Sequence, residues 1–377
     1  MARRFKNKSL YCNGLAGVLL MAICVSPGLA AQFPDVIDQR SVLSTQASHA
    51  TLLSIARAGE RLVAVGERGV VVLSDDSGRT WRQVQVPVSS TLTAVQFVNS
   101  RQGWAVGHSG VILHSGDAGQ SWTLQLDGRR AAQQELNDAQ TAALETNADE
   151  GAQRRLVAAQ RLVTDGPDKP FLALSFSDTM HGLAVGAYGL VMRTEDGGMT
   201  WRSWMGRIPN TQGLHLYAVA QAGDRYYLAG EQGLLIRSLD GGKSFEKLNS
   251  PYEGTYFSLA LDSDGAVLIG GLRGNVFRSR DQGSDFEAMN NPVPVSLGSA
   301  IRIGQQVLWV NQAGGVLRST GDSSTLQPLA TPAAPALTAV VDAPDGSLVG
   351  VGFAGTARLA ISNVNATSSN PERAVAE

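Results

Sequence analysis

The sequence predicts an all-β fold, a seven-bladed β-propeller with a helical hairpin inserted between blades two and three. Three observations predict it. A glycine-centred pattern repeats seven times, mostly at intervals of about 40 residues. Each repeat contains short apolar runs bounded by turn residues, which is typical of strands. One interval is about twice as long as the others, and its extra residues are rich in helix formers.

The chain begins with a segment that is typical of a secretory signal peptide. Basic side chains gather in residues 3–8, an apolar run follows over residues 15–25, and small residues surround Ala30. Eleven apolar residues are too few to span a hydrocarbon core of ~30 Å as a helix. We therefore predict a signal peptide over residues 1–30, no transmembrane segment after its removal, and export to the periplasm or an equivalent lumen, with secretion as the alternative destination. An uncleaved anchor is the alternative.

The charge and cysteine content of the predicted mature chain argue against disulfides, lipid attachment and nucleic-acid binding. Cys12 and Cys24 both lie in the signal segment, and Ile23 is too bulky for a lipoprotein cleavage site, so no thiol, lipid or disulfide is expected afterwards. Removing four basic residues leaves 27 Lys and Arg against 33 Asp and Glu, a formal charge of 27 − 33 = −6. Such a chain has no general reason to bind nucleic acid.

A single glycine aligns the seven repeats. The glycines are Gly69, Gly110, Gly189, Gly233, Gly274, Gly314 and Gly355, with separations of 41, 79, 44, 41, 40 and 41 residues. The second repeat shows four apolar runs, at 92–98, 103–107, 110–115 and 121–126. Four strands in about 40–45 residues make one propeller blade, so residues 31–361 are predicted to form seven blades.

The two ends of the ring have to be joined. The last repeat has no fourth strand that begins with an aromatic residue, and we expect a segment within Gln32–Ala50 to supply it, because an open sheet edge invites aggregation. Residues 362–377 are polar and are predicted to be disordered.

A turn motif, Ser/Thr-x-Asp-x-Gly-x-Ser/Thr-aromatic, joins the third and fourth runs of five repeats. Glycine takes φ > 0 without strain, Asp accepts hydrogen bonds from turn amides, and the aromatic residue packs between blades. One Asp offers too few oxygens for Ca²⁺, and no Lys follows the glycines as a phosphate loop requires. We expect a structural role, without metal or cofactor. The residues are Asp76, Gly78 and Trp81; Asp117, Gly119 and Trp122; Asp196, Gly198 and Trp201; Asp240, Gly242 and Phe245; Asp281, Gly283 and Phe286.

This motif is identified as the Asp-box, or bacterial neuraminidase repeat. Asp-box propellers include sialidases and other glycosidases, sortilin-like receptors, and the photosystem II stability and assembly factors. The stretch "VGAYGLVMRTEDGGMTW" resembles the repeats of the last family most closely. That resemblance implies an exported, non-catalytic propeller that binds a protein partner and acts in the assembly or stability of a membrane complex.

A sialidase-like glycoside hydrolase or a carbohydrate-binding propeller is the alternative. Sialidases carry an Arg-Ile/Leu-Pro signature before the first Asp-box, whereas Arg207-Ile208-Pro209 follows the third one here. The candidate nucleophiles Tyr226, Tyr227 and Tyr256 stand at strand positions where aromatic residues are ordinary. The five histidines show no metal-ligand spacing.

The loops opposite the Asp-boxes are where recognition is expected. Turns between second and third strands share a face with the connections between blades, and their side chains vary on a constant glycine frame. We predict partner binding by Arg68, His108, Tyr188, Glu231, Arg273 and Gln312. Ordinary solvated loops are the alternative.

Four arginines precede the turn motif at one equivalent position and should form an arc on the ring. They are Arg193, Arg237, Arg278 and Arg318. The resemblance to assembly factors implies an arginine patch for partner binding. Pairing with carboxylates of the turns or of neighbouring blades is the alternative.

The long interval contains an insertion, residues 127–170. Ala, Gln, Leu and Glu dominate it, apolar residues recur at helical spacing, and "ETNADEG" is a plausible break. We predict a helical hairpin on the face of the variable loops, acting either as a partner-binding element or as a lid on its own propeller. A monomer is expected.

Overall fold

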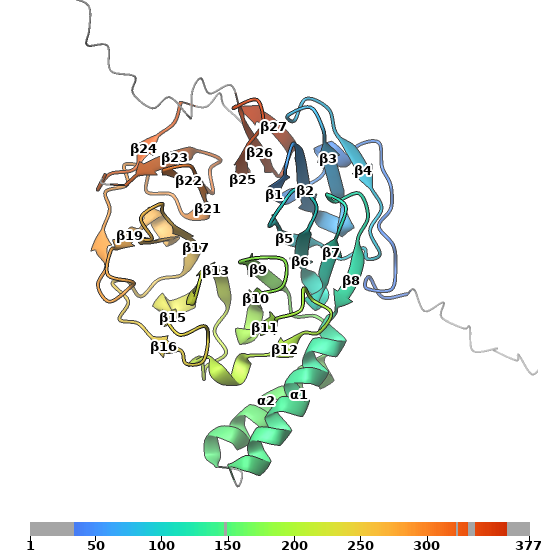
Figure 1. The fold of residues 1–377 in the computed structure, drawn as a ribbon, viewed down its shortest axis with the longest axis vertical. Coiled ribbons are helices and arrows are strands. Elements are labelled where there is room, and N and C mark those ends of the chain that lie inside the picture. Colours follow the sequence, from blue (N-terminus) through green and yellow to red (C-terminus); the bar gives the residue numbers. More distant parts are fainter. Residues whose placement is uncertain (1–33, 147–148, 322, 331–335, 360–377) are drawn as a thin grey trace, which may run out of the picture. The chain divides into compact units, whose positions relative to one another are not determined.

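The computed structural model describes residues 34–146, 149–321, 323–330 and 336–359. The described residues from Asp35 onward belong to one compact unit. Seven antiparallel sheets stand around a central opening, as Figure 1 shows. The predicted fold class is therefore confirmed. The predicted signal peptide and C-terminal tail lie outside the described residues.

Six blades contain four strands in sequence order from the centre of the ring outward. Blade one is β1 (Leu52–Ala58), β2 (Arg61–Gly66), β3 (Val71–Ser74) and β4 (Arg82–Val84). Blade two is β5 (Leu92–Phe97), β6 (Gly103–Gly107), β7 (Ile112–Ser115) and β8 (Thr123–Leu126). Blade three is β9 (Phe171–Phe176), β10 (Gly182–Gly186), β11 (Val191–Thr194) and β12 (Arg202–Ser203).

The remaining blades follow the same order. Blade four is β13 (Leu216–Ala222), β14 (Arg225–Gly230), β15 (Leu235–Ser238) and β16 (Glu246–Lys247). Blade five is β17 (Tyr256–Leu261), β18 (Val267–Gly271), β19 (Val276–Ser279) and β20 (Glu287–Ala288). Blade six is β21 (Leu297–Ile303), β22 (Gln306–Asn311), β23 (Val316–Thr320) and β24 (Gln327–Pro328). Blade seven is β25 (Leu337–Asp342), β26 (Leu348–Gly352) and β27 (Gly355–Leu359).

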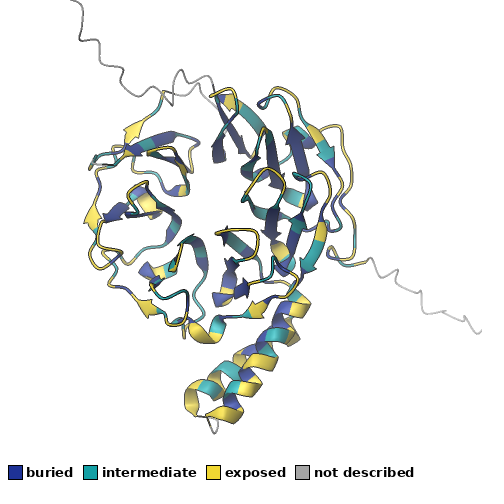
Figure 2. Cartoon of the chain, in the orientation of Figure 1, coloured by how far each residue is buried: buried dark blue, intermediate teal, exposed yellow. Residues whose placement is uncertain are grey.

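The core lies between blades. Buried apolar residues form seven hydrophobic clusters in the described chain, and each cluster draws on two neighbouring blades. Between blades two and three, Trp104 stacks on Phe176 with ring centroids 3.8 Å apart. Figure 2 shows the same pattern, with buried strands and exposed connecting turns. Each blade therefore buries both of its faces against its neighbours, as its nearly continuous apolar strands require.

The expected closing strand is not found among the described residues. Blade seven has three described strands, and residues 34–50 contain no strand. Instead, this segment runs past the outer edge of blade one: Ser41 donates its amide to the carbonyl of Val86 (3.0 Å), and its hydroxyl accepts the Val86 amide (2.9 Å). The short helix η1 (Ala47–His49) then reaches β27. The closing-strand prediction is wrong for this part of the chain.

The insertion forms the predicted helical hairpin. Helix α1 (Gly128–Glu145) and helix α2 (Glu150–Asp165) project outward from the ring beside β12 (Figure 1). Each helix begins at an aspartate whose carboxylate accepts a backbone amide, Asp127 from Arg130 and Asp149 from Ala152. Neither helix is long and apolar enough to cross a membrane, and the same holds for the other helices in the described ranges.

The hairpin is fastened to itself and to blade three through a buried carboxylate. Glu135 is 2% exposed and binds the Arg155 guanidinium through both oxygens, at 2.9 and 3.0 Å. The hydroxyl of Ser203, on β12, also donates to Glu135. Because α1 and α2 lie outside the ring, the hairpin does not cover the central opening in Figure 1.

Candidate protein-binding face

The sheet order places two sets of loops on opposite faces of the ring. Turns between second and third strands share one face with the connections between blades, and the turn motifs lie on the other. On the first face, which we call the loop face, the turns are η2 (Glu67–Gly69), η3 (His108–Gly110), η4 (Ala187–Gly189), η6 (Glu231–Gly233) and η7 (Leu272–Gly274). Blade six has a related turn at 311–314.

The aligning glycine of each repeat is required by these turns. All seven have φ between 61° and 91°. A Cβ on Gly69 would lie 2.3 Å from the carbonyl oxygen of Val88, and one on Gly355 would lie 2.0 Å from that of Ser48. The turn residue before the glycine also has φ > 0 in five blades, at Arg68, Ser109, Tyr188, Gln232 and Arg273. The repeat thus fixes the turn backbone and leaves the side chains free to vary.

The structure brings the six predicted turn residues to the loop face. Arg68, His108, Tyr188, Arg273 and Gln312 are exposed. Glu231 is partly buried, because its Oε2 accepts the backbone amide of His215 at 2.8 Å and lies 2.9 Å from the Nδ1 of the same residue. Their role in partner binding stays a prediction.

An aromatic row, not among the site residues predicted from the sequence, runs from this face to the innermost strands of blades four and five. Tyr188 of η4 lies 4.9 Å from the His215 ring, His215 lies 6.2 Å from Tyr217, and Tyr217 lies 5.3 Å from Phe257, measured between ring centroids. We call these four residues the aromatic arc. It crosses blades three, four and five, and Tyr188 is 53% exposed.

A repeated β-bulge explains the position of two arc residues. In every blade the pairing register of the innermost strand shifts between its first and third residues. A bulge redirects the extra side chain away from the regular ladder. The bulged residues are Leu53, Thr93, Leu172, Tyr217, Phe257, Gly298 and Thr338. The sequence contains this signal once the seven inner strands are aligned, because Tyr217 and Phe257 are then the second residue of their strands.

On the opposite face the turn motif satisfies its own polar groups. In blade two, the Ser115 hydroxyl donates to Asp117 Oδ1 (2.9 Å) and accepts the Gly119 amide (2.8 Å). Ser121 donates its amide to Oδ1 (2.9 Å) and its hydroxyl to Oδ2 (2.6 Å) of Asp117. The indole Nε1 of Trp122 donates to the carbonyl of Gly119 (2.9 Å). The carboxylate of this aspartate is therefore engaged in organising the turn and is poorly placed to bind a metal ion.

The same bonds recur around Asp76, Asp196 and Asp240, while Asp281 faces Asp285 in place of a hydroxyl residue. The hydroxyl and amide of Thr80 lower the pKa of Asp76 to about 2. For Asp117 and Asp196, burial raises the pKa, but the hydrogen bonds together outweigh it and the pKa is lowered. In the described residues, no group of three or more His, Cys, Asp or Glu is placed to hold a metal ion.

The turn motif also links neighbouring blades. The residue after the motif aspartate has φ > 0, and in four blades its carbonyl accepts a hydrogen bond from the preceding blade. The donors and acceptors are Arg61 to Ala118, Gln125 to Gly197, Arg237 to Gln282, and Arg358 to Ser77. This carbonyl is therefore an inter-blade contact point.

Three of the four predicted arginines, Arg193, Arg237 and Arg278, take part in contacts between blades. Arg193 is buried: it donates to the Tyr226 hydroxyl of blade four (2.5 Å) and to Glu195 (3.0 Å), and its guanidinium lies 4.5 Å from the Trp204 ring centroid. Arg237 also binds Glu246 (2.8 Å) on its own blade.

Arg278 is buried as well, and it donates to the carbonyls of Ser323 (2.9 Å) and Thr320 (3.3 Å) in blade six. Arg318 binds Gln327 of its own blade at 3.2 Å. Arg193 thus pairs with a turn carboxylate, Glu195, as the alternative expects, and Arg193 and Arg278 offer little surface to a partner.

The three tyrosines that are candidate nucleophiles for glycoside hydrolysis are buried in the ring. Tyr226, Tyr227 and Tyr256 are all at most 2% exposed, and burial raises the pKa of Tyr256 to about 12. Ile208 is buried, and Arg207 lies over the Trp204 ring (5.4 Å to the centroid). A phenol that is enclosed and hard to ionise is poorly suited to attack a sugar.

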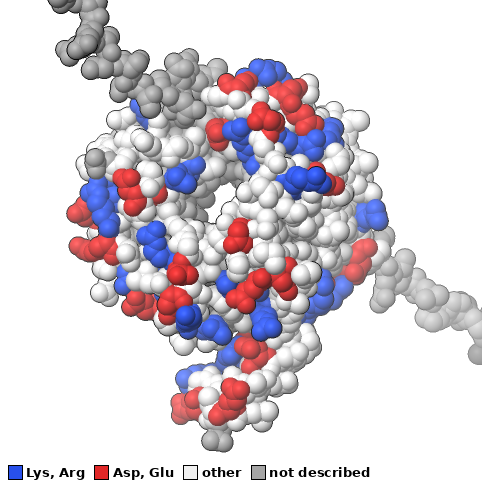
Figure 3. All heavy atoms as spheres, in the orientation of Figure 1, with Lys and Arg blue, Asp and Glu red and all other residues white. Residues whose placement is uncertain are grey.

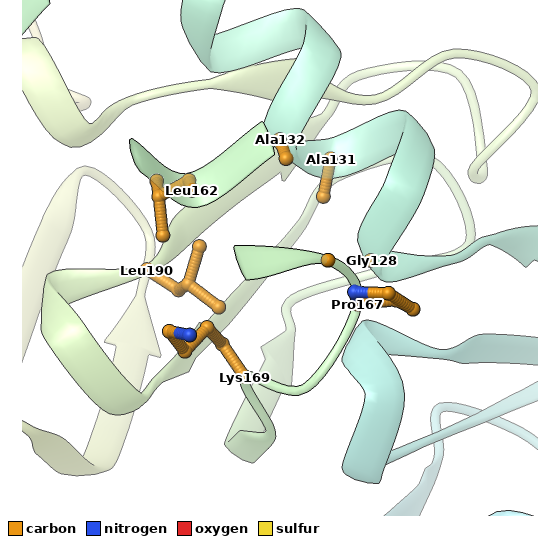
Figure 4. A pocket seen from close by; sticks show the side chains of 8 residues that line it. Gly128, Ala131, Ala132, Leu162, Pro167, Lys169 and Leu190 are labelled. Carbon is orange, nitrogen blue, oxygen red and sulfur yellow. The ribbon is translucent and has the colours of Figure 1, made fainter. Parts of the chain in front are cut away.

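A pocket lies where the base of the hairpin meets blade three, as Figure 4 shows. Its volume of ≈ 10 Å³ is room for about one water molecule. The lining residues are Gly128, Ala131, Ala132, Leu162, Gly166, Pro167, Lys169 and Leu190. A small-molecule substrate does not fit there. Figure 3 shows cationic and anionic side chains interspersed over the face in view, around a central hollow, without a large patch of one sign.

Comparisons with known proteins agree with this architecture. The family model described as "Photosynthesis system II assembly factor YCF48" matches residues 73–153 and 159–306. "Photosystem II assembly lipoprotein Ycf48" of Synechococcus sp. (strain CC9902) is 34% identical over 77 residues, which are 20% of this chain and 23% of the relative. The match thus spans about a quarter of that relative.

Solved structures share the fold. "YCF48 bound to D1 peptide" has a TM-score of 0.60 and 15% identity, over 86% of this chain and 97% of the other. "YCF48 from Cyanidioschyzon merolae" has a TM-score of 0.58 and 14% identity, over 84% and 97%. A streptogramin B lyase has a TM-score of 0.56 and 14% identity, over 86% and 98%. Since an enzyme is among them, these likenesses show the propeller alone.

Proposed function

Because the chain belongs to the photosynthesis system II assembly factor YCF48 family, we propose that it is an exported, non-catalytic propeller that binds a protein partner and supports the assembly or stability of a membrane complex. One member of the fold, YCF48, has been solved with a D1 peptide. A relative is a lipoprotein, which accords with the export signal expected at the start of this chain.

The difference between the two faces of the ring is the main support for the proposal. The turn motifs and the arginines beside them are engaged in hydrogen bonds within and between blades. The loop face instead presents exposed, varied side chains on a fixed backbone, among them Arg68, His108, Tyr188, Arg273 and Gln312. Rigid frames with variable loops are where proteins place recognition.

Crosslinking and affinity capture from the native envelope test the proposal. The mature protein should recover a defined membrane-complex subunit. A loop-face variant, Arg68→Ala/Tyr188→Ala/Arg273→Ala, should recover about tenfold less, in line with the loss of interface hot spots. The matched control is Gln120→Ala/Met199→Ala/Lys243→Ala, whose three exposed residues lie in turn motifs and should leave recovery unchanged.

Two results would contradict the proposal. One is recovery of no protein partner by the unaltered chain, with or without residues 127–170. The other is robust hydrolysis of a fluorogenic sialoside or glycoside panel by the purified protein.

A further inference from the structure

The aromatic arc has a distinctive chemical character. Aromatic ring faces carry negative potential and attract cations. The structure already holds one cation there: Lys169 Nζ lies 5.0 Å from the centroid of the Tyr188 ring. This ammonium is neutralised by Asp168 and by Asp165 (3.3 Å). The Tyr188 ring therefore already contacts one ammonium group, and the charge of that group is balanced by two carboxylates.

Carboxylates predominate along the arc. Glu231 lies beside His215, and burial together with the Glu231 charge raises the pKa of Tyr217, so this carboxylate also acts on the Tyr217 hydroxyl. Glu253 is exposed on the connection next to η6, where a Cβ on Gly233 would lie 3.3 Å from its Cα. With Asp165 and Asp168, the turns and connections around the arc carry four carboxylates, and Lys169 is the cation that contacts Tyr188.

The opposite charge begins at blade five. Arg273 is exposed on η7, one blade beyond Glu231. A ligand with positive charge is therefore favoured over Tyr188 and Tyr217 and disfavoured as it approaches Arg273. The site is therefore complementary to a positively charged ligand, and Arg273 marks its boundary at blade five.

We propose that the aromatic arc, Tyr188, His215, Tyr217 and Phe257, docks an extended segment of the protein partner through an arginine or lysine side chain laid over Tyr217 beside Glu231. The proposal rests on the proposed function and deepens it, because it names the part of the loop face that binds and the chemistry that it recognises. The partner side chain gains a cation–π contact and a carboxylate, and Phe257 covers its aliphatic stem.

A titration of the isotope-labelled mature protein with synthetic decapeptides, followed by NMR, tests this proposal. The probes are Gly/Ser peptides with two central arginines, the same peptide with citrulline, which has the shape but not the charge, and the same peptide with glutamate. The arginine peptide should bind about tenfold more tightly than the citrulline peptide and shift the amides of residues 215–217. Equal affinity for the arginine and citrulline peptides would overturn the proposal, as would shifts confined to other blades.

Matched variants localise the effect. Tyr188→Leu, Tyr217→Leu and Glu231→Gln should each weaken binding of the arginine peptide at least about threefold. Phe353→Leu, which changes an exposed aromatic residue in the blade-seven turn outside the arc, should not. Tyr188 is exposed, so its variant keeps the test valid even if Tyr217→Leu fails to fold.

Capture from the envelope separates this inference from the proposed function. If the arc variants recover the native partner as well as the unaltered chain does, the docking site is wrong and the proposed function stands. If the unaltered chain recovers no partner at all, the proposed function itself fails.

Discussion

Arg358 of the last blade donates a 2.5 Å hydrogen bond to the backbone carbonyl of Ser77 in the first turn motif, 281 residues earlier. Its second nitrogen binds Asp345 at 2.6 Å. The acceptor is equivalent to the carbonyls that Arg61, Gln125 and Arg237 reach in other blades. The ring is thus closed by the same contact that joins its internal blades, in the absence of a described fourth strand in blade seven.

Replacing Arg358 should loosen this closure. Arg358→Met keeps the aliphatic stem but loses the charged donor, and we expect it to destabilise the protein by about 1–2 kcal/mol in urea unfolding. Arg161→Met, an exposed change on α2, is the control and should have little effect. Equal stability of the two variants would show that Arg358 does not help to close the ring.

Acid should destabilise the turn motifs. The pKa of Asp76 is about 2 in the folded chain, below its ordinary value of 3.8, so its ionised form is favoured by folding. That contribution is complete above about pH 4 and is lost as the pH falls through about 2. Unfolding midpoints in urea should therefore drop between pH 5 and pH 2.

The donor that shifts Asp76 most strongly offers a specific check. Thr80→Val removes the hydroxyl that binds Asp76 Oδ2 at 2.6 Å, so the acid-dependent loss should become smaller. Thr123→Val removes a hydroxyl that binds a backbone carbonyl and should leave the pH dependence as it is. The idea fails if both variants keep the unaltered pH profile.

The motif tryptophans should differ in importance. Trp122 is 6% exposed and meets Phe97 edge to face at 6.0 Å, whereas Trp81 is only partly buried. Trp122→Ala should cost about 3–5 kcal/mol, and Trp81→Ala clearly less. Calorimetric unfolding of the two variants measures the difference, and a reversed order would refute the packing account.

The Arg155–Glu135 pair should hold the helical hairpin together. Removing one partner of a buried pair leaves the other uncompensated, so Arg155→Met should destabilise the hairpin by about 3 kcal/mol. Hydrogen exchange should then rise in α1 and α2 but not in the ring strands. Arg154→Met, whose partner Glu150 is exposed, is the control. Unchanged protection of α1 and α2 in Arg155→Met would contradict this assignment.

Much of the fold was predictable because the sequence repeat reveals both the positions of the turns and the number of blades. Gly69, Gly110 and their equivalents mark turns in which φ is positive, and their spacing counts the blades. The hairpin was predictable from helix formers and a break. The path of the segment at 34–50 was not predictable. Its backbone makes isolated hydrogen bonds to blade one, such as that from the Ser41 amide to the Val86 carbonyl, and isolated hydrogen bonds leave no periodic pattern in the sequence.

The candidate site was predictable only in part. Variable turn residues such as Tyr188 stand out beside constant glycines. Tyr217 and Phe257 do not, because a bulge that redirects a side chain is invisible in one strand and appears only when the seven inner strands are aligned. For the arginines, sequence shows that they recur but not that Arg193 reaches Tyr226 in the next blade.

Photo-crosslinking from the two faces tests the central claim most directly. p-Benzoylphenylalanine is introduced at Tyr188, on the loop face, or at Lys243, an exposed residue of a turn motif on the opposite face. After irradiation in the native envelope, we expect a discrete protein adduct from position 188 and none from position 243. An adduct from position 243 alone, or equal adducts from both positions, would contradict it.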